Sequence, residues 1–561
     1  MKSAFLLLPI LLIVSCKDSG SNAGEERVSA VHTPVFTRDI APIIFKNCAS
    51  CHRPGQSAPF SLLTYRDVSR RAEDILTVTH SGYMPPWLPV SGDADFEGER
   101  TLTDAELATL KAWVDQGKVE GEASLLPELP KWSEGWMMES EPDLVLTLAE
   151  SFNLPAEGED VFRNFVFPVE ITQTRYVRAV EFRPGNPSVV HHAWMTVEKG
   201  DSCRRLDQAH PEAPGFPGMS MGYSAPPDGH ALGWTPGKLP NQSPPKMAWK
   251  FEPGTDLVLQ LHLIPSGKAE TIAPKIGLYF TDEAPTLHPY GFQLSASEID
   301  IPAGDADYLV ERHFTLPVNA SLLSLYPHAH YLGKTIQLHA TLPGGRRQTI
   351  LDIPDWDFNW QDLYTLNTPF DLPAGTQLHM KFRYDNSADN PRNPNLPPKR
   401  VRYGDRSSDE MGNLWLQLLA KNPQDRARLE EAALQNTVQA TPNFRDHYAL
   451  GNLYQGQGRH EKAVTQYRLA LALHPNHPLL HHNLAGSLAA SNQLEAAIAA
   501  MKESIRLDPN YANSHLNLGN FYAMKNEFRA AWEAYRDCLK IEPANEVARR
   551  NFGILNRQLS K

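Results

Sequence analysis

The chain has 561 residues, too many for one hydrophobic core, and at about 100–200 residues per domain it predicts roughly three to five domains. Hydrophobic residues make up 41% and charged residues 21%, which excludes both a disordered chain and a multi-span membrane protein. The net charge of −12 leaves the chain as a whole no attraction for nucleic acid. The 21 histidines and only 5 cysteines favour imidazole-bound metal over a disulfide scaffold.

Residues 1–15 have the features of a secretory signal peptide. Their apolar run from Ala4 to Val14 is shorter than the roughly twenty residues that span a bilayer. The run ends in IVSC, which resembles a bacterial lipobox, in which Cys16 becomes the lipidated N-terminus. Residues 16–32 would then form a tether, and the alternative is a simple signal peptide cleaved nearby. We expect an exported protein in the bacterial periplasm or at the cell surface, attached to the membrane only by a lipid anchor on Cys16.

The sequence CASCH at residues 48–52 predicts a covalently attached haem c. Cys48 and Cys51 lie three residues apart on a helical turn and can form thioethers with the haem vinyl groups. The adjacent His52 then reaches the iron. The alternative is a redox-active or disulfide-bonded pair, but that interpretation gives His52 no role. Export supports haem, because c-type haem is attached in an oxidising compartment.

The flanking sequence predicts a small all-α domain over residues 33–125. Residues 36–47 have helical apolar spacing, and Thr103–Glu106 resembles a capping box that opens a second helix. Two such helices packed together would resemble a class I cytochrome c. The sixth iron ligand should be a soft thioether in a Pro-rich loop, and Met84 in GYMPPW fits this description. His80, four residues earlier, is the rival.

Residues 126–142 are rich in Pro and Gly turns and predict a linker. From residue 143 to residue 420, short runs of alternating apolar residues are separated by Pro and Gly. This pattern is typical of antiparallel β-sandwiches. Its length predicts two of them, over residues 143–290 and 291–420.

Three histidines of the first predicted sandwich could share one metal ion. His191 and His192 are adjacent on a strand, so both can reach one ion only at a twist or a strand end. His262 ends another alternating run, LQLH. Three imidazoles suit copper or zinc, although a single buried histidine is more often an ordinary core residue.

The second predicted sandwich offers a softer set of ligands. His328 and His330 are two residues apart, which places both imidazoles on the same face of a strand. Met411, in DEMGN, adds a thioether. Two imidazoles and a thioether suit copper that must be stable as Cu(I), whereas a thioether is a poor zinc ligand.

The order HH, LQLH, HAHYLG, DEMGN resembles the copper type II, ascorbate-dependent monooxygenases, the family of peptidylglycine hydroxylase and dopamine β-hydroxylase. The resemblance covers about residues 150 to 420 and implies two jelly-roll-like copper domains. It assigns the electron-transfer copper to His191, His192 and His262, and the catalytic copper, which binds oxygen and substrate, to His328, His330 and Met411.

The resemblance implies two copper ions and hydroxylation of a C–H bond, in which O2 and two electrons give hydroxylated product and water. It also implies a solvent cleft between the two sites. Its motifs depart from the peptide-amidating branch, because Tyr326 and Trp415 replace a basic residue and a tyrosine, although Asn413 is retained. A peptide carboxylate would lack its cation, so we expect another, unknown organic substrate.

The last fifth of the chain is a repeat. Gly451, Ala485 and Gly519 recur every 34 residues, which is the tetratricopeptide period. We predict such repeats over residues 436–559, with three units from 442 to 545 and a capping helix at Glu546–Leu559. Such arrays bind peptides or partner proteins, and the alternative is a purely stabilising appendage. The inter-repeat histidines are expected to be solvated: His474, His477, His481 and His482.

The sequence therefore predicts a multidomain chain: a small all-α cytochrome c, two antiparallel β-sandwich copper domains and an α-solenoid. The fusion favours an exported copper-dependent monooxygenase that receives electrons from a periplasmic donor through its own haem. The alternative is a non-catalytic electron-transfer or copper-holding lipoprotein that docks to a partner through its repeats.

Overall fold

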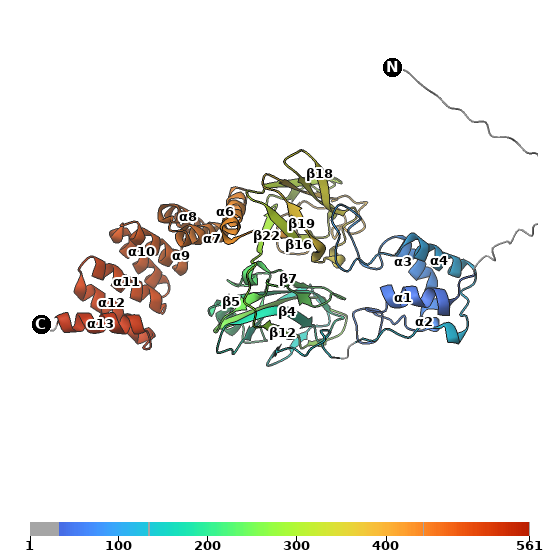
Figure 1. Cartoon of the computed structure of the whole chain (residues 1–561), viewed down its shortest axis with the longest axis horizontal. Coiled ribbons are helices and arrows are strands. Elements are labelled where there is room, and N and C mark those ends of the chain that lie inside the picture. The colour runs from blue at the N-terminus through green and yellow to red at the C-terminus, as the bar shows by residue number, and fades with distance from the viewer. Residues whose placement is uncertain (1–32, 133–134, 441, 560–561) are drawn as a thin grey trace, which may run out of the picture.

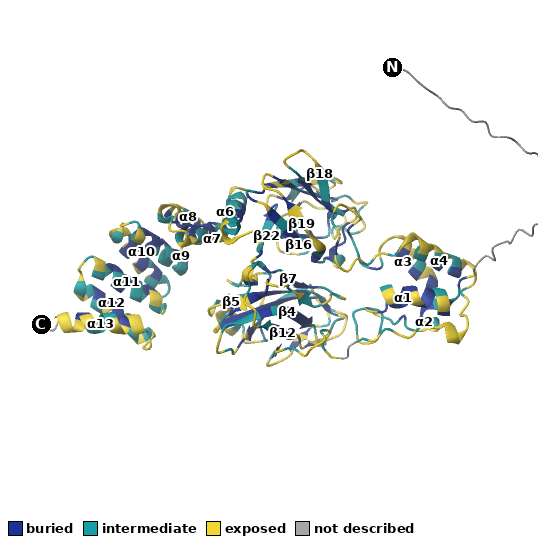
Figure 2. Cartoon of the chain, viewed as in Figure 1, coloured by how far each residue is buried: buried dark blue, intermediate teal, exposed yellow. Residues whose placement is uncertain are grey.

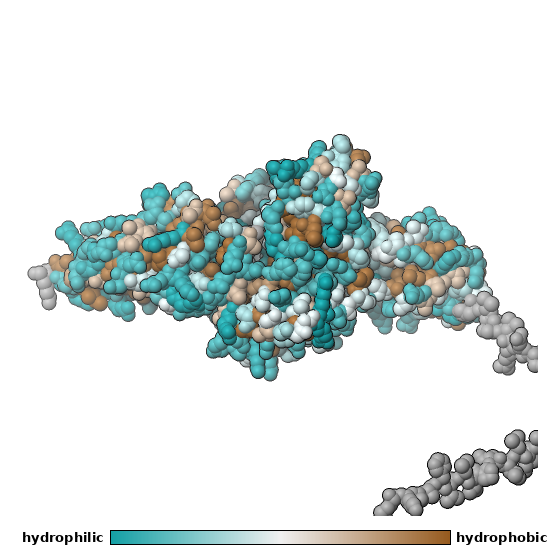
Figure 3. Space-filling model, turned by 90° about the horizontal axis from the view of Figure 1, so that it is seen from above, coloured by the Kyte–Doolittle hydropathy of each residue, from teal (hydrophilic) through white to brown (hydrophobic). Residues whose placement is uncertain are grey.

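The computed structural model describes residues 33–132, 135–440 and 442–559. The predicted signal peptide, the lipidation at Cys16 and the tether therefore lie outside the described residues. The described chain is elongated, with an N-terminal helical domain and a C-terminal helical array at opposite ends and two β-domains between them (Figure 1). Within this part of the chain, no helix combines the length and the apolar character needed to cross a membrane. On the face seen in Figure 3, hydrophobic side chains form separate patches among hydrophilic ones.

The N-terminal domain contains both predicted helices. The first is a π-helical turn that continues into an α-helix, and the second begins with the predicted capping box at Thr103. Phe36 of the first and Trp113 of the second have ring centroids 6.3 Å apart in a shared core. The helices are η1 (Phe36–Ile40), α1 (Ala41–Asn47), α2 (Tyr65–Ser69), α3 (Ala72–His80), α4 (Asp104–Asp115) and η2 (Ala123–Leu125).

Residues 87–100 leave the N-terminal domain and pack on the second β-domain. Phe96 is only 7% exposed and belongs to the hydrophobic core of that β-domain. It forms a β-bridge with Leu366, and the ring of Trp87 lies 5.4 Å from that of Tyr364. The N-terminal domain is therefore held against the β-domains by an embedded segment.

The first β-domain has two five-stranded antiparallel sheets with a shared core (Figure 2), and a two-stranded sheet in which β11 pairs with β2. One sheet has the order β1-β12-β4-β8, with β9 also on β4, and the other has the order β6-β3-β10-β5-β7. Every residue of β10 is buried, because it is the central strand of its sheet. The elements are β1 (Leu144–Thr147), β2 (Phe152–Leu154), β3 (Val161–Pro168), β4 (Arg175–Arg183), β5 (Val190–Lys199), α5 (Ser202–Gln208), β6 (Phe216–Pro217), η3 (Pro227–Gly229), β7 (Leu232–Trp234), β8 (Asn241–Gln242), β9 (Trp249–Phe251), β10 (Thr255–Leu263), β11 (Glu270–Ile272) and β12 (Lys275–Thr281).

The second β-domain also has two four-stranded antiparallel sheets that share one core, with orders β13-β22-β16-β19 and β15-β20-β17-β18, and a two-stranded sheet in which β14 pairs with β21. The elements are β13 (Tyr290–Ser295), β14 (Asp300–Ile301), β15 (Tyr308–Thr315), β16 (Ala320–His328), β17 (Gly333–Thr341), β18 (Arg347–Ile353), η4 (Phe358–Trp360), β19 (Tyr364–Leu372), β20 (Gln377–Tyr384), β21 (Val401–Arg402) and β22 (Asn413–Ala420). The four cysteines among the described residues, Cys48, Cys51, Cys203 and Cys538, are free, so packing holds both β-domains together.

The C-terminal array consists of paired helices that start after α6. Leu429 and Ala433 of α6 belong to the core of the second β-domain, so α6 connects that domain to the array. A Cβ atom on Gly451 would lie 2.5 Å from Tyr467, which explains the small residue there. The helices are α6 (Pro423–Ala440), α7 (Phe444–Gly456), α8 (His460–Leu473), α9 (Pro478–Ala490), α10 (Leu494–Leu507), α11 (Ala512–Met524), α12 (Phe528–Ile541) and α13 (Glu546–Leu559), the last matching the predicted capping helix.

The array also contacts the first β-domain. Arg445 Nη2 donates a hydrogen bond to Ser220 Oγ at 3.4 Å, and the rings of Tyr223 and His477 are 5.3 Å apart. His477 is 2% exposed, so the prediction that it is solvated was wrong. Its aromatic neighbours Phe444 and Tyr448 come from α7, and no local sequence pattern predicts this packing.

Candidate metal centres

His191, His192 and His262 meet at one point of the first β-domain. In the pairing of β10 with β5, His262 lies opposite His192 and Leu263 lies opposite Val190, which leaves His191 as an extra residue. Such a β-bulge changes the direction of a side chain, so two adjacent histidines can converge. His191 Nδ1 lies 3.1 Å from both His192 Nδ1 and His262 Nδ1. The structure therefore brings these three predicted ligands together, near the start of a strand.

The three imidazoles fit a metal ion. One ligand nitrogen from each lies within 4.8 Å of the others. Nitrogens bound to one tetrahedral ion at about 2.0 Å are separated by about 3.3 Å, close to the observed spacing. Burial lowers the pKa of His191 to about 4, which keeps the ring in the neutral form that binds metals.

Asp160, a residue that the sequence analysis missed, orients His262. His262 Nε2 donates to Asp160 Oδ2 at 3.0 Å, so Nδ1 is left as the acceptor that faces the other histidines. The same carboxylate oxygen accepts from Ser407 Oγ at 3.2 Å. Hydrogen bonding to His262 lowers the pKa of Asp160. Because Ser407 belongs to the second β-domain, this carboxylate links the two domains beside the candidate metal site.

His328 is the last residue of β16, and His330 lies two residues beyond the strand rather than on it, with the two ring centroids 5.1 Å apart. His328 Nδ1 donates to Gln361 Oε1 at 2.5 Å, and His330 Nδ1 donates to the carbonyl oxygen of Asp409 at 3.1 Å. Both rings therefore keep Nε2 as the nitrogen available for a metal. Hydrogen bonding through the other nitrogen is the usual arrangement for histidine ligands.

The Met411 loop is held beside the HAH segment by one buried carboxylate. Glu410 accepts hydrogen bonds from the backbone nitrogens of His330, Leu332 and Met411. Met411 is 6% exposed, and Asn413 Nδ2 lies 3.7 Å from its sulfur. Burial raises the pKa of Glu410 to about 8. The sequence analysis missed Glu410, although its place beside Met411 was an available signal.

One phenyl ring contacts histidines of both sets. The centroid of Phe358 in η4 is 5.7 Å from that of His191, 6.2 Å from that of His262 and 5.6 Å from that of His330. Phe358 is 3% exposed. A buried aromatic side chain therefore contacts a histidine of each set.

The CASCH segment forms one helical turn. The backbone nitrogen of His52 donates to the carbonyl oxygen of Cys48 at 2.9 Å, and both thiols are free. His52 Nδ1 donates to the carbonyl oxygen of Phe60 at 3.2 Å, which leaves Nε2 for an iron ion. Burial raises the pKa of Cys48 to about 12, unlike the lowered value of a reactive redox dithiol. These features fit a haem attachment site better than a redox-active pair.

The two candidate sixth ligands differ in their surroundings. Met84 is partly buried, and its backbone nitrogen donates to the carbonyl oxygen of Val78 at 3.0 Å. His80 is exposed, and its Nδ1 donates to the carbonyl oxygen of Leu76 at 3.0 Å. The partly buried thioether is the better candidate for an enclosed haem iron.

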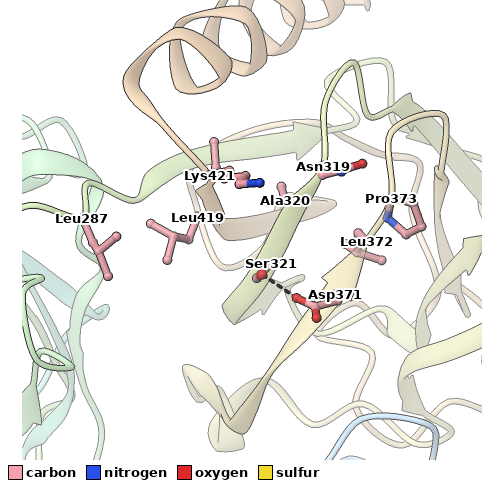
Figure 4. A pocket seen from close by; sticks show the side chains of 10 residues that line it. Leu287, Asn319, Ala320, Ser321, Asp371, Leu372, Pro373, Leu419 and Lys421 are labelled. Carbon is pink, nitrogen blue, oxygen red and sulfur yellow. Dashed lines mark hydrogen bonds between the residues drawn. The ribbon is translucent and has the colours of Figure 1, made fainter.

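A surface groove of about 450 Å³ lies at the other end of β16 from His328 (Figure 4). Ala320 and Ser321 begin that strand in the groove, and Ser321 Oγ donates to Asp371 Oδ1 at 2.6 Å. At about 3.3 Å per residue, β16 separates the groove from His328 by roughly 25 Å. The groove contains none of the predicted metal ligands.

Comparisons with known proteins identify the C-terminal region. Tetratricopeptide-repeat family models match residues 444–477, 486–526 and 512–545. The C-terminal array consists of tetratricopeptide repeats. This confirms the predicted repeats, and the chain as a whole is multidomain, with a β-rich region before them. No curated protein matches the sequence.

Similar solved structures include crystal structures of MamA. One of them is 22% identical to this chain, and the match covers 24% of this chain and 81% of the MamA chain, with a TM-score of 0.24. The first tetratricopeptide domain of Spaghetti (RPAP3), bound to an HSP90 peptide, is 20% identical, with coverage of 21% and 94% and a TM-score of 0.21. The Sgt2 tetratricopeptide domain from Aspergillus fumigatus is 24% identical, with coverage of 21% and 79% and a TM-score of 0.20.

Proposed function

We propose that this protein is an exported copper-dependent monooxygenase that hydroxylates a C–H bond with O2 and receives electrons through a fused c-type haem. The observation that carries the proposal is the convergence of His191, His192 and His262 at 3.1 Å beside a second, chemically different ligand set. Three imidazoles suit a copper that transfers electrons. Two imidazoles and a thioether suit one that cycles through Cu(I).

At the second site, copper held by His328, His330 and Met411 would supply the activation of O2. The chain positions these ligands: Gln361 and Asp409 orient the two imidazoles, and Glu410 holds the methionine loop against the HAH segment. Burial lowers the pKa of His328 to about 3, so the imidazole stays neutral and its Nε2 keeps a lone pair for the metal. The buried ring of Phe358 packs against that of His330, with centroids 5.6 Å apart.

At the first site, Asp160 fixes the ring of His262 and so sets which nitrogen faces the metal. In the N-terminal domain, Cys48 and Cys51 would hold the haem covalently, His52 would be an axial ligand, and Met84 is the proposed sixth ligand. The embedded segment around Phe96 gives the haem-binding domain a fixed contact with the β-domains.

The substrate we propose is an organic molecule other than a peptide C-terminus. Tyr326 stands where a cation would bind the peptide carboxylate, and its hydroxyl donates to Gln361 Oε1 at 3.2 Å. The tetratricopeptide repeats support a protein partner, since the HSP90 peptide bound to the RPAP3 repeats shows that such arrays can bind peptides. The periplasm or the cell surface remains the proposed location.

The test measures O2 uptake by the purified, copper-loaded full chain. The reaction contains metabolite extracts from a strain from which this protein has been deleted. We expect extract-dependent O2 uptake, two copper ions and one haem per chain, and loss of the uptake in Met411→Ala. Met524→Ala, an exposed methionine in the repeats, is the matched control and should keep full activity. Unchanged O2 uptake in Met411→Ala would contradict the enzyme and favour a non-catalytic electron carrier docked through its repeats.

A further inference from the structure

The turn that follows β7 in the first β-domain has a well-defined shape. The backbone nitrogen of Lys238 donates to the carbonyl oxygen of Thr235 at 3.0 Å, which closes a turn of four residues. Pro236 and Gly237 occupy its two central positions, and Gly237 has a φ of +85°. A proline followed by a residue with positive φ is typical of a type II β-turn. We call residues 235–238 the TPGK turn.

An enclosed carboxylate of the second β-domain holds the TPGK turn in place. Asp362 Oδ1 accepts from Thr235 Oγ1 at 3.3 Å and from Lys238 Nζ at 2.8 Å, and only 14% of the Asp362 side chain is exposed. The other carboxylate oxygen accepts from Arg100 Nη2 at 3.0 Å, and Arg100 is the last residue of the embedded segment. Hydrogen bonds between charged groups are stronger than those between neutral groups. The turn is therefore fixed where the N-terminal region and both β-domains meet.

The tip of the TPGK turn contacts a predicted haem-attachment cysteine. A Cβ atom on Gly237 would lie 3.0 Å from Cys51 Sγ and 3.2 Å from Arg100 Nη1, too close for an ordinary side-chain contact. Glycine therefore permits both the close approach and the positive φ at this position. In a haem c, the sulfur of such a cysteine is bonded to the edge of the haem. A group that packs against Cys51 Sγ thus packs beside the haem edge.

The other end of the TPGK turn leads to the three-histidine set. β7 pairs antiparallel with β5, and Trp234, the last residue of β7, lies opposite Ala193. His192 directly precedes Ala193, so the turn leaves the sheet at the end of β5 that carries the two adjacent histidines. Gly237 is three residues beyond Trp234, which at about 3.3 Å per residue is a distance of at most ~10 Å. A short stretch of chain therefore joins the contact with Cys51 to the metal-binding end of β5.

We infer that the TPGK turn is the surface on which the first β-domain receives the haem edge, and that electrons pass from there to the three-histidine set. In each transfer the iron loses one electron and the copper gains one, and no proton moves. This direction agrees with the electron-transfer role that the resemblance assigns to His191, His192 and His262. The inference rests on the proposed function, because it requires haem and copper to be bound.

The docking is tested by amide hydrogen exchange in the haem-loaded, copper-free full chain. Gly237→Val places a branched side chain against Cys51 Sγ, so the backbone amides of residues 48–52 should lose protection. Gly254→Val is the matched control, because Gly254 lies in the same β-domain with a φ of +78°, yet a Cβ atom there meets nothing within 4 Å. The control should keep the wild-type protection.

A second variant reaches the same contact without adding bulk at the tip of the turn. Lys238→Met removes the ammonium group that binds Asp362, so residues 48–52 should again lose protection, though less than in Gly237→Val. Wild-type protection of these amides in both variants would overturn the docking.

The electron path is tested by following haem oxidation by its absorbance, without O2 or substrate, after the haem of the Cu(II)-loaded full chain has been reduced. We expect a fast phase that is lost in Gly237→Val and kept in Gly254→Val, with unchanged haem and copper contents. The fast phase should also be lost in His262→Ala, which removes the three-histidine site, and should survive in His328→Ala. Survival in His262→Ala with loss in His328→Ala would overturn the path.

Ascorbate separates failure of the path from failure of the proposed function, because it reduces copper directly. If ascorbate supports O2 uptake by Gly237→Val in the metabolite extracts while the fast phase is lost, the hydroxylase is intact and only the path has been cut. If the wild type takes up no O2 even with ascorbate, the proposed function fails, and the exchange of residues 48–52 still decides the docking.

Discussion

Single side chains outside the ligand sets control the geometry of the candidate metal centres. Asp160 and Glu410 are not predicted ligands, yet each holds one predicted ligand where the metal would bind. Partners of this kind direct the lone pair of a histidine and limit the motion of its ring. They also connect segments that are far apart in the sequence, such as Asp160 and Ser407.

Replacing Asp160 by asparagine should weaken copper binding at the three-histidine site by about 10–100-fold, because His262 loses its charged acceptor. Competition with a chromophoric copper chelator measures this affinity. Asp201→Asn is the control, since Asp201 lies in the same domain but is 64% exposed and pairs with Arg205. An unchanged affinity in Asp160→Asn would mean that His262 does not bind copper through Nδ1.

Burial of His477 makes stability depend on pH. Burial lowers its pKa from 6.5 to about 4 in the folded chain. Between these values the unfolded chain takes up a proton that the folded chain does not, so stability falls as the pH falls through this window. Above pH 6.5, the imidazole of His477 is neutral in both the folded and the unfolded chain, so its burial no longer costs stability.

The variant His477→Asn should remove this dependence, because asparagine keeps an acceptor for the backbone nitrogen of Leu480 at the start of α9. On lowering the pH from about 7 to about 5, the wild type should lose up to about 2 kcal/mol more unfolding free energy than the variant. Denaturant titrations at the two pH values give the difference. Equal losses would mean that His477 is not buried in solution.

At the scale of elements, the paired helices of the repeats depend on close approach at small residues. Gly451 faces Tyr467 and Gly519 faces Tyr535, each with 2.5 Å between a hypothetical Cβ atom and the ring. In the middle repeat, Ala485 replaces the glycine, and the residue 34 positions after Tyr467 is Met501. A flexible methionine leaves room for a methyl group that a rigid tyrosine ring does not.

Gly451→Ala should therefore destabilise the array by about 1–3 kcal/mol, despite the better helix propensity of alanine. Gly456→Ala in the same helix is the matched control, because a Cβ atom there meets nothing within 4 Å. The control should be neutral or slightly stabilising. Thermal unfolding followed by circular dichroism compares them, and equal melting temperatures would contradict the packing argument.

At the scale of the whole molecule, the N-terminal domain is attached to the β-domains by residues 87–100. Phe96→Ala should destabilise the second β-domain by about 3 kcal/mol, because it empties a core position filled from another domain. It should also increase proteolytic cleavage within the segment. Val90→Ala, in the same segment but 47% exposed, should change neither property. Stability and cleavage that match the control would show that the segment is not part of the core.

The sequence by itself determined the features that depend on local spacing. The 34-residue recurrence of Gly451, Ala485 and Gly519 requires only regular helix pairs, so the repeats were predicted and confirmed, and α13 spans the residues of the predicted capping helix. Short alternating runs likewise predicted the β-rich region. The ligand types could be named one by one, but their haem and copper functions remain predictions.

Only the tertiary structure decided which side chains meet. The bulge at His191, which turns adjacent histidines toward His262, depends on how β5 pairs with β10, in which His262 lies 71 residues after His191. The burial of His477 and the entry of Phe96 into another domain's core depend in the same way on contacts between distant segments. Periodicity shows which face of an element is apolar, but the partner of that face is chosen by packing, for which local sequence carries no signal.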